Sequence, residues 1–333
     1  MSVRIGKVPQ DVLERLVLSR LGARRPDVLV HSRIGEDCSV IDFGDFVCVV
    51  STDPITGAAA NIGWFAVHIS CNDVAANGAE PVGLLITVMV PPDACEEDIG
   101  RVMGDADRAA RSLGVEILGG HSEVTSAVTR LTVVSTALGK ARRDSFITSS
   151  GARPGDHLIL TKAAGLEGTA ILAADLAERL IQGGIGRERV ANAREFIRNI
   201  SVVREGMIAA ANGATAMHDV TEGGVMGAVF ELCEASGAGV RIWEDRIPVA
   251  PETRDICHLL GIDPLKLTSS GCMLISAVCS KRVMDAFDEA GIPASVIGEI
   301  VEPGRGRVLV RQGGDEVEIR PPERDELYRA LEG

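Results

Sequence analysis

Short acidic segments in the first half of this chain carry the residue types best suited to chemistry. They occupy residues 35–37, 51–53, 71–73 and 119–123, each where an expected strand or helix meets a loop. Converging carboxylates repel one another and commonly share a cation, and the hard ion Mg²⁺ prefers oxygen ligands. The placement of these segments therefore predicts a metal site. Its candidate ligands are Asp37, Asp53 and Asp73.

Each of these aspartates also has an ordinary structural explanation. Aspartate caps helices and closes turns, which is a sufficient reason for any one of the three taken alone. It explains the three together less well, particularly because Asn72 directly precedes Asp73. Asp219 leaves two interpretations equally open, a cap for the helix expected to begin near Val225 and a contact with a ligand.

Two glycine-rich turns in the second half, at residues 165–169 and 221–224, each precede an expected helix. Backbone N–H groups at a helix N-terminus favour anions, so Gly165 and Gly168 are candidates to hold phosphate. Such turns also begin helices for packing reasons alone. Lys162 is a candidate phosphate contact, with a solvated lysine as the alternative. Neither a Walker motif nor G-x-G-x-x-G occurs, which excludes P-loop and Rossmann nucleotide sites.

The composition excludes several classes of protein. The net charge is −13 and no basic run occurs, so nucleic-acid binding is not expected. The eight cysteines include no C-x-x-C pair, as is typical of reduced thiols in a cytosolic protein. Residues 1–10 lack the apolar core of a signal peptide, and the longest apolar run, 82–92, is too short to span a bilayer. We therefore expect a cytoplasmic protein with no membrane partner.

Hydrophobic periodicity predicts the elements that must position these residues. In the first half, strands and helices follow one another in the order β-α-β-α-β-β, which suggests an α+β sheet covered by helices on one face. A small, polar, turn-rich stretch at 149–156 predicts a domain boundary, dividing the chain into domains 1–150 and 151–333. The expected helices are 10–21, 64–77, 99–113, 170–180, 225–235 and a charged one within 321–333; the expected strands are 46–50, 82–90, 115–118, 131–138 and 157–161.

The same segments resemble the motifs of a known superfamily. Residues 72–81 resemble its NDLAAMGAxP motif, which is the most specific match, and residues 218–224 resemble the D-x-T-R-G-G of one branch. Weaker similarities are those of 35–40 to GDDAAV, 52–53 to a TD strand end, 119–122 to GG(D/E)T, and 153–156 and 165–169 to the opening strand and glycine loop of the second domain. The chain is thereby identified as a member of the superfamily of aminoimidazole ribonucleotide synthetase (PurM), thiamine-monophosphate kinase, selenophosphate synthetase and HypE, and it most resembles the HypE-like, AIR synthase-related proteins.

The resemblance implies a two-domain PurM-like fold, with an N-terminal α+β domain that forms a barrel-like sheet across a homodimer and a C-terminal α/β domain. It implies ATP in the cleft, Mg²⁺ on Asp37, Asp53 and Asp73, and activation or phosphorylation of a small molecule or a partner's group through the γ-phosphate. Further roles follow from the matched motifs. Asn72 would neighbour the nucleotide, Gly119 and Gly120 would line the phosphate end, and His121 and Asp219 would be catalytic.

Departures from the family pattern leave the acceptor open. HypE proteins end in a cysteine that carries the thiocarboxamide, whereas residues 328–333 contain none. Glu222 stands where the HypE motif has arginine, and His121 stands where several branches have an acidic residue. Two alternatives therefore remain beside the enzyme, a HypE-like maturation or nucleotide-binding partner protein without its own catalysis and a thiamine-monophosphate-type kinase.

Overall fold

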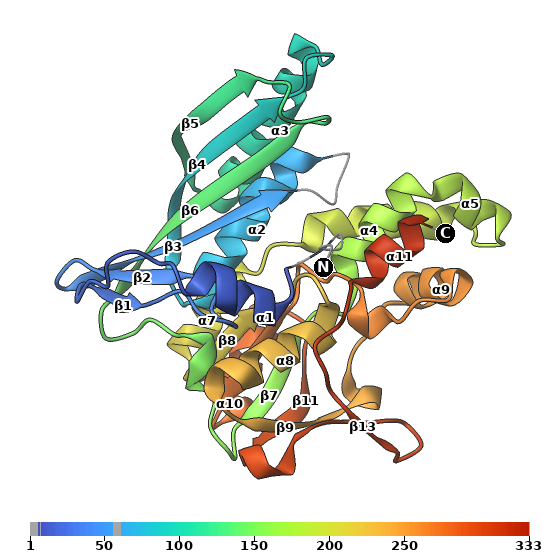
Figure 1. The fold of residues 1–333 in the computed structure, drawn as a ribbon. Helices are drawn as coiled ribbons and strands as arrows, with labels where there is room; N and C mark the ends of the chain where they lie inside the picture. Colours follow the sequence, from blue (N-terminus) through green and yellow to red (C-terminus); the bar gives the residue numbers. More distant parts are fainter. Residues whose placement is uncertain (1–5, 7, 56–60, 333) are drawn as a thin grey trace.

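The computed structural model describes residue 6 and residues 8–55 and 61–332. Two twisted sheets form its framework, and the first contains six strands in the order β1-β2-β3-β6-β4-β5 (Figure 1). Only β4 and β5 pair in parallel. The strands are β1 (Val28–Val30), β2 (Ser39–Asp42), β3 (Phe46–Ile55), β4 (Glu80–Val90), β5 (Glu116–Val124) and β6 (Thr132–Arg142).

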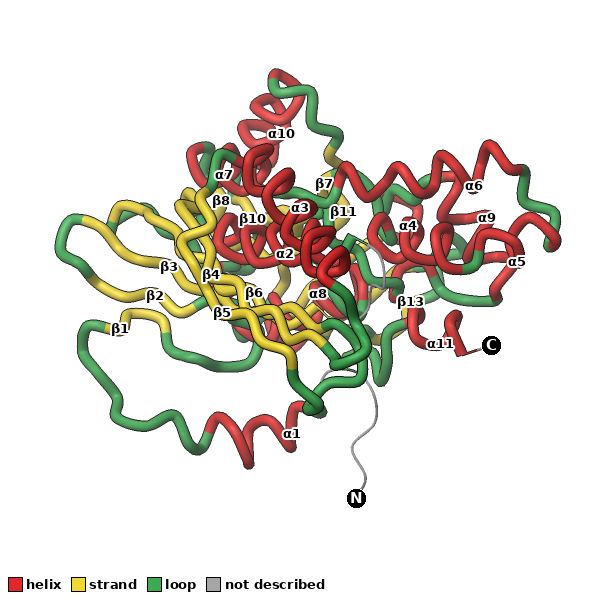
Figure 2. The backbone as a smooth tube through the Cα atoms, turned by 90° about the horizontal axis from the view of Figure 1, so that it is seen from above, coloured by secondary structure: helices red, strands yellow, loops and turns green. Residues whose placement is uncertain are grey.

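Two long helices, α2 (Ile62–Ala76) and α3 (Glu96–Leu113), cover one face of this sheet (Figure 2). Small residues let them pack closely. A Cβ atom at Gly139 of β6 would lie 2.1 Å from Val74 Cγ1 on α2, and one at Gly63 would lie 2.0 Å from the carbonyl oxygen of Val102 on α3. The resulting succession β3-α2-β4-α3-β5-β6 confirms the order predicted from the sequence, with the helices on one face.

Several boundaries differ from the prediction. β3 extends to Ile55, so Asp53 lies inside a strand. β5 continues through residues 119–121, which were expected to form a loop, because glycine there permits a close backbone approach: a Cβ at Gly120 would lie 1.8 Å from the carbonyl oxygen of Ile86. The helix expected at 10–21 is shorter, with α1 (Gln10–Leu13) continuing as a π-helix (Glu14–Leu18).

The second sheet has seven strands in the order β13-β12-β9-β11-β7-β10-β8, and only β12 and β9 pair in parallel. Apolar residues of α8 pack on one face, and those of α7 and α10 pack on the other. The strands are β7 (His157–Thr161), β8 (Ala214–Asp219), β9 (Gly239–Trp243), β10 (Met273–Ala277), β11 (Ala294–Val301), β12 (Arg307–Val310) and β13 (Glu316–Glu318).

The helices of this half include a group beside the second sheet, formed by α4, α5, α6 and α9 (Figure 2). The predicted helix at 170–180 is divided near Leu176 into α4 and α5, and the terminal charged helix is confirmed as α11. Their bounds are α4 (Leu166–Asp175), α5 (Ala177–Gln182), α6 (Arg187–Arg194), α7 (Val203–Ala211), α8 (Gly224–Ser236), α9 (Pro251–Leu260), α10 (Ser280–Glu289) and α11 (Glu326–Glu332). Among the described residues, no helix has the length and apolar character needed to cross a membrane.

Asn72 fastens the first half of the chain to the second. Its side chain is fully buried on α2, where Nδ2 donates to the carbonyl oxygen of Ile200 at 2.7 Å and Oδ1 accepts from the N–H of Val202 at 2.8 Å. The same helix meets α7 without intervening side chains, since a Cβ at Gly206 would lie 2.3 Å from the carbonyl oxygen of Ala75. Both backbone groups held by Asn72 depend on its amide because they lie outside regular helices and strands.

We predict that Asn72→Ala lowers the free energy of unfolding by about 2 kcal/mol or more, since it leaves buried backbone groups without hydrogen bonds. Asn212→Ala is the matched control, because the Asn212 side chain donates within its own helix end to the carbonyl oxygen of Ile208. Urea unfolding followed by circular dichroism measures both. Equal losses in the two variants would show that the bridge between the halves is not important for stability.

Candidate functional site

Four aspartates from separate elements meet where the two halves of the chain join. Asp37 precedes β2, Asp53 lies in β3, Asp73 lies in α2, and Asp219 ends β8. The hydroxyl of Ser51 links two of them, donating to Asp73 Oδ2 at 2.5 Å and lying 3.5 Å from Asp53 Oδ2. The three predicted metal ligands therefore lie together, and they line one cavity.

The electrostatics of this cluster are those of carboxylates that lack enough positive charge. Burial raises the pKa of Asp73 well above its usual range, and the charges of Asp219 and Asp53 raise it further. Burial and the charge of Asp37 raise the pKa of Asp219 to about 7, although His218 opposes this. Neither carboxylate oxygen of Asp219 has a hydrogen-bond partner among the described residues. Such buried, unpartnered oxygens cost free energy unless a cation or proton neutralises them.

These residues fit a hard divalent cation in their chemistry. The donors are carboxylate oxygens, the ligands that Mg²⁺ takes. They are not yet arranged as a finished centre, because no three His, Cys, Asp or Glu side chains of the described part already surround one point. A bound cation would relieve the repulsion that now acts among them, and Asp219 adds a fourth carboxylate to the three predicted from the sequence.

His218 holds one of the aspartates in place. Its Nδ1 lies 2.8 Å from Asp37 Oδ2 and 3.2 Å from Ser149 Oγ, and its Nε2 lies 3.1 Å from Glu231 Oε2 on α8. Burial lowers the pKa of the imidazole, but the charges and hydrogen bonds of Asp37 and Glu231 outweigh burial and raise this pKa well above its usual value. His218 is thus a buried cation between two carboxylates. The only sequence signal for it is its place directly before Asp219.

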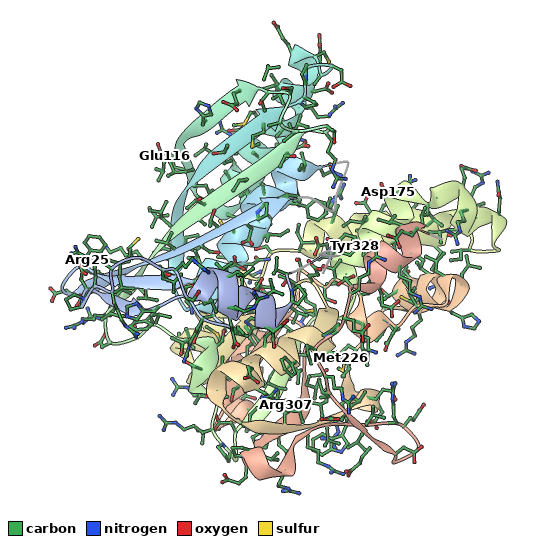
Figure 3. All side chains as sticks on the ribbon, in the orientation of Figure 1. Arg25, Glu116, Asp175, Met226, Arg307 and Tyr328 are labelled. Carbon is green, nitrogen blue, oxygen red and sulfur yellow. The ribbon has the colours of Figure 1, made fainter. Side chains whose placement is uncertain are left out.

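The opposite wall of the cavity was not predicted from the sequence. It is formed by Glu167 on α4, the turn that carries Glu222, and the segment from Asp325 to Tyr328 that begins α11. The cavity measures about 220 Å³. Tyr328 lies on α11 near the middle of the molecule (Figure 3). The sequence singled out the turn containing Glu222 as a glycine-rich turn before a helix and as a departure from a motif, but not as part of a cavity, and nothing in the sequence pointed to Asp325.

The contacts of Lys162 and Asn72 do not support the nucleotide-binding roles predicted for these two residues. The Lys162 ammonium lies 2.6 Å from Glu205 Oε1 and donates to the carbonyl oxygens of Asn199 and Ser201 at 3.0 and 2.5 Å. Asn72 is occupied by the bridge between the halves. These polar groups already have protein partners, and neither residue lines the cavity.

The glycine loop before α4 serves packing. The N–H of Gly165 donates to Ser269 Oγ at 2.6 Å, so it is not directed at an anion. A Cβ at Gly168 would lie 2.5 Å from side-chain atoms of Leu267, so glycine is needed there to fit α4 against the neighbouring segment. Of the two interpretations that the sequence left open for this loop, the structure favours packing.

Gly119, Gly120 and His121 lie on β5, at the edge of the first sheet and away from the cavity in a single chain (Figure 1). The His121 side chain is 66% exposed, and its Nε2 lies 3.2 Å from Glu123 Oε2. Within one chain the structure therefore does not bring these three residues to the carboxylates, because β5 is not a loop that could fold back over them.

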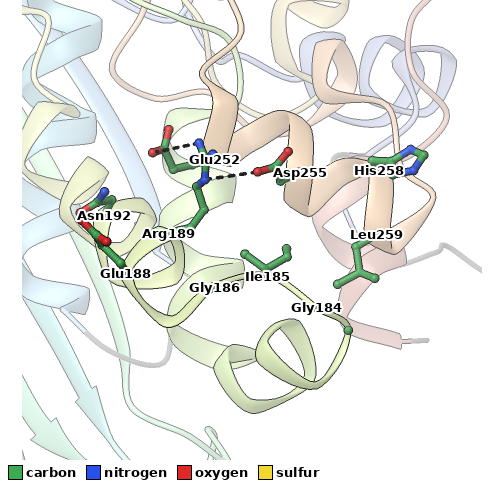
Figure 4. A pocket seen from close by; sticks show the side chains of 11 residues that line it. Gly184, Ile185, Gly186, Glu188, Arg189, Asn192, Glu252, Asp255, His258 and Leu259 are labelled. Carbon is green, nitrogen blue, oxygen red and sulfur yellow. Dashed lines mark ion pairs between the residues drawn. The ribbon is translucent and has the colours of Figure 1, made fainter.

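A second, larger hollow of about 800 Å³ lies between the α5–α6 turn and α9 (Figure 4). Its charged groups are largely satisfied by each other: Arg189 lies 3.6 Å from Glu252 Oε1 and 3.3 Å from Asp255 Oδ2. It contains none of the residues predicted from the sequence. The aspartate cavity is therefore the candidate functional site.

Comparisons with known proteins place this geometry in a family. Residues 35–141 match the family described as AIR synthase related protein, N-terminal domain, and residues 153–311 match its C-terminal domain. Carbamoyl dehydratase HypE of Cupriavidus necator is 30% identical over 279 residues, covering 79% of this chain and 76% of the relative. The HypE of Escherichia coli is 29% identical over 256 residues, covering 75% and 73%.

Solved structures agree on the fold. A crystal structure of E. coli HypE has a TM-score of 0.74 at 26% identity, covering 85% of this chain and 88% of that one. A HypE in complex with ATP (TM-score 0.72, 22% identity, 98% of each chain) and AaThiL complexed with AMPPCP and TMP (0.73, 19%, 95% and 98%) share the fold. The chain has a two-domain PurM-like fold and belongs to the AIR synthase-related protein family.

Proposed function

We propose that this protein is an ATP- and Mg²⁺-dependent enzyme that activates or phosphorylates a small molecule or a partner's group through the γ-phosphate. The observation that carries the proposal is the set of buried aspartates with unpartnered Asp219 oxygens. An acidic protein that binds a triphosphate needs a cation between the two sets of negative charge. The relative solved with ATP supports the choice of nucleotide.

In this proposal Asp37, Asp53, Asp73 and Asp219 hold the metal, which when bound supplies charge neutralisation for phosphoryl transfer. His218 orients Asp37 through the 2.8 Å contact between Nδ1 and Oδ2, and Glu231 in turn fixes the imidazole of His218. The role of the protein is then to position the reacting groups, because phosphoryl transfer depends on alignment and electrostatic stabilisation more than on covalent catalysis.

A second candidate function is that of a nucleotide-binding maturation partner without its own turnover. A structure of a HypE–HypF complex with the same fold supports it (TM-score 0.75, 20% identity, covering 93% of this chain and 99% of that one). A screen of acceptors, including thiamine monophosphate, with ATP and Mg²⁺ separates the two candidates and the kinase alternative. Release of ADP with an acceptor supports the enzyme, whereas ATP binding without ADP release from any acceptor favours the partner protein.

Asp73→Asn should weaken Mg²⁺-dependent ATP binding roughly tenfold or more, because the variant loses a charged ligand at the centre of the cluster. Asp288→Asn, a charge-matched change at an exposed position of α10, should leave binding unchanged. Calorimetric titration of ATP with and without Mg²⁺ measures both variants. Undiminished metal-dependent binding by Asp73→Asn would refute the assignment of the metal site.

The raised pKa of Asp219 predicts how stability depends on pH. The folded, metal-free protein keeps this proton up to about pH 7, whereas the unfolded chain releases it near 3.8. The folded state binds more protons in that window, so this group's contribution to stability falls as the pH rises from about 4 to 7. Mg²⁺ should therefore raise the melting temperature more at pH 8 than at pH 5.

Asp219→Asn should raise the melting temperature of the metal-free protein at pH 8 and reduce its response to Mg²⁺, since the uncompensated charge is gone. Thermal unfolding at pH 5 and pH 8, with and without MgCl₂, checks both expectations. An equal Mg²⁺ response of the wild type at the two pH values would contradict them.

We further propose that the protein is a homodimer joined through the open face of the first sheet. That face, opposite α2 and α3, exposes Val82, Leu85 and Leu118 to 51%, 44% and 51%. Soluble monomers rarely leave such apolar patches uncovered. A second copy on this face would also cover the strand that carries His121. The proposed site role of His121 requires such a dimer, because within one chain this residue lies away from the aspartates.

Leu85→Glu should convert the dimer to a monomer, because it places a charge in the apolar centre of the proposed interface. Val278→Glu is the control, since Val278 is exposed on the other half of the chain. Sedimentation velocity of both variants and the wild type measures the state of association. A monomeric wild type, or a dimer that persists in Leu85→Glu, would refute the proposed interface.

A further inference from the structure

One buried hydroxyl close to the aspartate cluster makes no hydrogen bond. Ser135 lies on β6, its side chain is fully buried, and its Oγ has no partner in the part of the chain that the structure describes. Its backbone carbonyl, by contrast, accepts from the hydroxyls of Thr52 and Ser70 at 3.2 and 3.3 Å. The backbone is therefore fixed while the hydroxyl is free to turn. A buried hydroxyl without a partner costs free energy, so its presence calls for a reason.

Strand pairing places Ser135 directly beside Asp53. The two residues are partners in the antiparallel register of β3 and β6. Side chains of directly opposite residues point to the same face of a sheet, and their Cβ atoms lie roughly 4.5–5.5 Å apart. A serine hydroxyl and an aspartate carboxylate at such positions can meet by rotation about their side-chain bonds.

The face that these two side chains share is the face covered by α2, where the metal site lies. Two residues before Asp53 on the same face of β3, the hydroxyl of Ser51 donates to Asp73 on α2 at 2.5 Å. One turn before Asp73, Ser70 donates to the carbonyl oxygen of Ser135 at 3.3 Å. Ser135 therefore lies beneath the helical turn that leads to Asp73 and next to the strand position of Asp53.

The side chains that contact Asp53 cannot donate to it once a cation is bound. The hydroxyl of Ser51 lies 3.5 Å from Asp53 Oδ2, but it has a single proton, which it donates to Asp73 over the shorter distance of 2.5 Å. Asp73 also hydrogen-bonds Asp53, but a carboxyl group donates only while it is protonated, and a carboxylate that binds a metal ion is not. The unused hydroxyl beside Asp53 is then that of Ser135.

We propose that Ser135 is a positioning residue of the metal site, whose hydroxyl donates to the Asp53 carboxylate when a divalent cation is bound. The proposal rests on the proposed function, because it requires a cation on the aspartates. Ser135 does not line the cavity, so it acts on the cation through Asp53 and not as a ligand. Hydrogen bonds that orient metal-binding carboxylates typically change metal affinity by roughly 10–100-fold.

Ser135→Ala should have opposite effects on stability and on metal affinity. In the metal-free protein it removes a buried hydroxyl that makes no hydrogen bond, so the melting temperature should stay equal or rise. In the metal-bound protein it removes the donor to Asp53, so the affinity for the cation should fall roughly tenfold or more. A serine that served only the packing of α2 on the sheet would lower the melting temperature when truncated.

Ser70→Ala is the matched control, because it removes a second buried hydroxyl at the same contact between α2 and β6. Ser70 donates to a backbone carbonyl and not to a carboxylate. This variant should therefore lower the melting temperature of the metal-free protein by roughly 1–3 °C and leave the cation affinity within about twofold of the wild type.

Mn²⁺ serves as the probe in place of Mg²⁺, since both cations prefer oxygen ligands. The electron paramagnetic resonance signal of free Mn²⁺ broadens on binding, which gives a dissociation constant without requiring activity. Thermal unfolding of the EDTA-treated protein, followed by circular dichroism, gives the metal-free melting temperatures. Equal Mn²⁺ affinity of the wild type and Ser135→Ala, or an equal loss of affinity in Ser70→Ala, would overturn the proposal. A metal-free melting temperature of Ser135→Ala as low as that of Ser70→Ala would assign Ser135 to packing instead.

The Mn²⁺ titrations are run with and without AMPPCP, and calorimetry measures AMPPCP binding, so that this proposal and the proposed function can fail separately. Mn²⁺ binding that is weakened in Ser135→Ala, without AMPPCP binding to the wild type, would keep the role of Ser135 and reject the ATP-dependent function. Mn²⁺-dependent AMPPCP binding with the same Mn²⁺ affinity in both proteins would keep the function and reject this role. A wild type that binds no Mn²⁺ in either condition would reject the metal site and the role of Ser135 together.

Discussion

Mutual repulsion among buried carboxylates is the constraint around which this structure is organised. Asp37, Asp53 and Asp73 come from the first half of the chain and Asp219 from the second, and burial keeps water from screening Asp73 and Asp219. Charges in such surroundings interact much more strongly than at a surface. Protons or a cation on Asp73 and Asp219 therefore stabilise the junction between the halves, which links folding, pH and metal binding at one place.

Polar contacts across the junction position this cluster. Asn72, the residue before Asp73, is fixed to the segment that leads into α7, and His218, the residue before Asp219, is fixed to Asp37. Asp37, Asp73 and Asp219 thus each have a neighbour in sequence or space that links the two halves of the chain. Substituting such a neighbour would displace the carboxylates without removing any of them, a loss of positioning more than of chemistry.

The carboxylates on the two sides of the cavity differ in their hydrogen-bond partners. Among the metal-binding aspartates, Asp73 accepts from the Ser51 hydroxyl and Asp37 contacts His218, whereas Asp219 has no hydrogen-bond partner in the described chain. On the side of the second half, Glu167 and Asp325 accept hydrogen bonds from backbone N–H groups and a hydroxyl, which fix their orientation. A buried carboxylate without a donor, such as Asp219, suits a metal ion.

The sequence by itself determined the order of elements in the first half, the family, and the three aspartates that lie together, because local periodicity and short motifs record these features. It did not determine which of the remaining motif residues reach the site. The sequence predicted phosphate contacts at Lys162, Gly165 and Gly168. In the folded protein, Lys162 instead contacts Glu205 and backbone carbonyl oxygens, and the N–H of Gly165 donates to Ser269. His121 read as a loop residue, but pairing with β4 placed it in an edge strand. The second wall, from Glu167 to Asp325, exists only because residues 158 positions apart in sequence converge around Thr268, and no local pattern encodes such a contact.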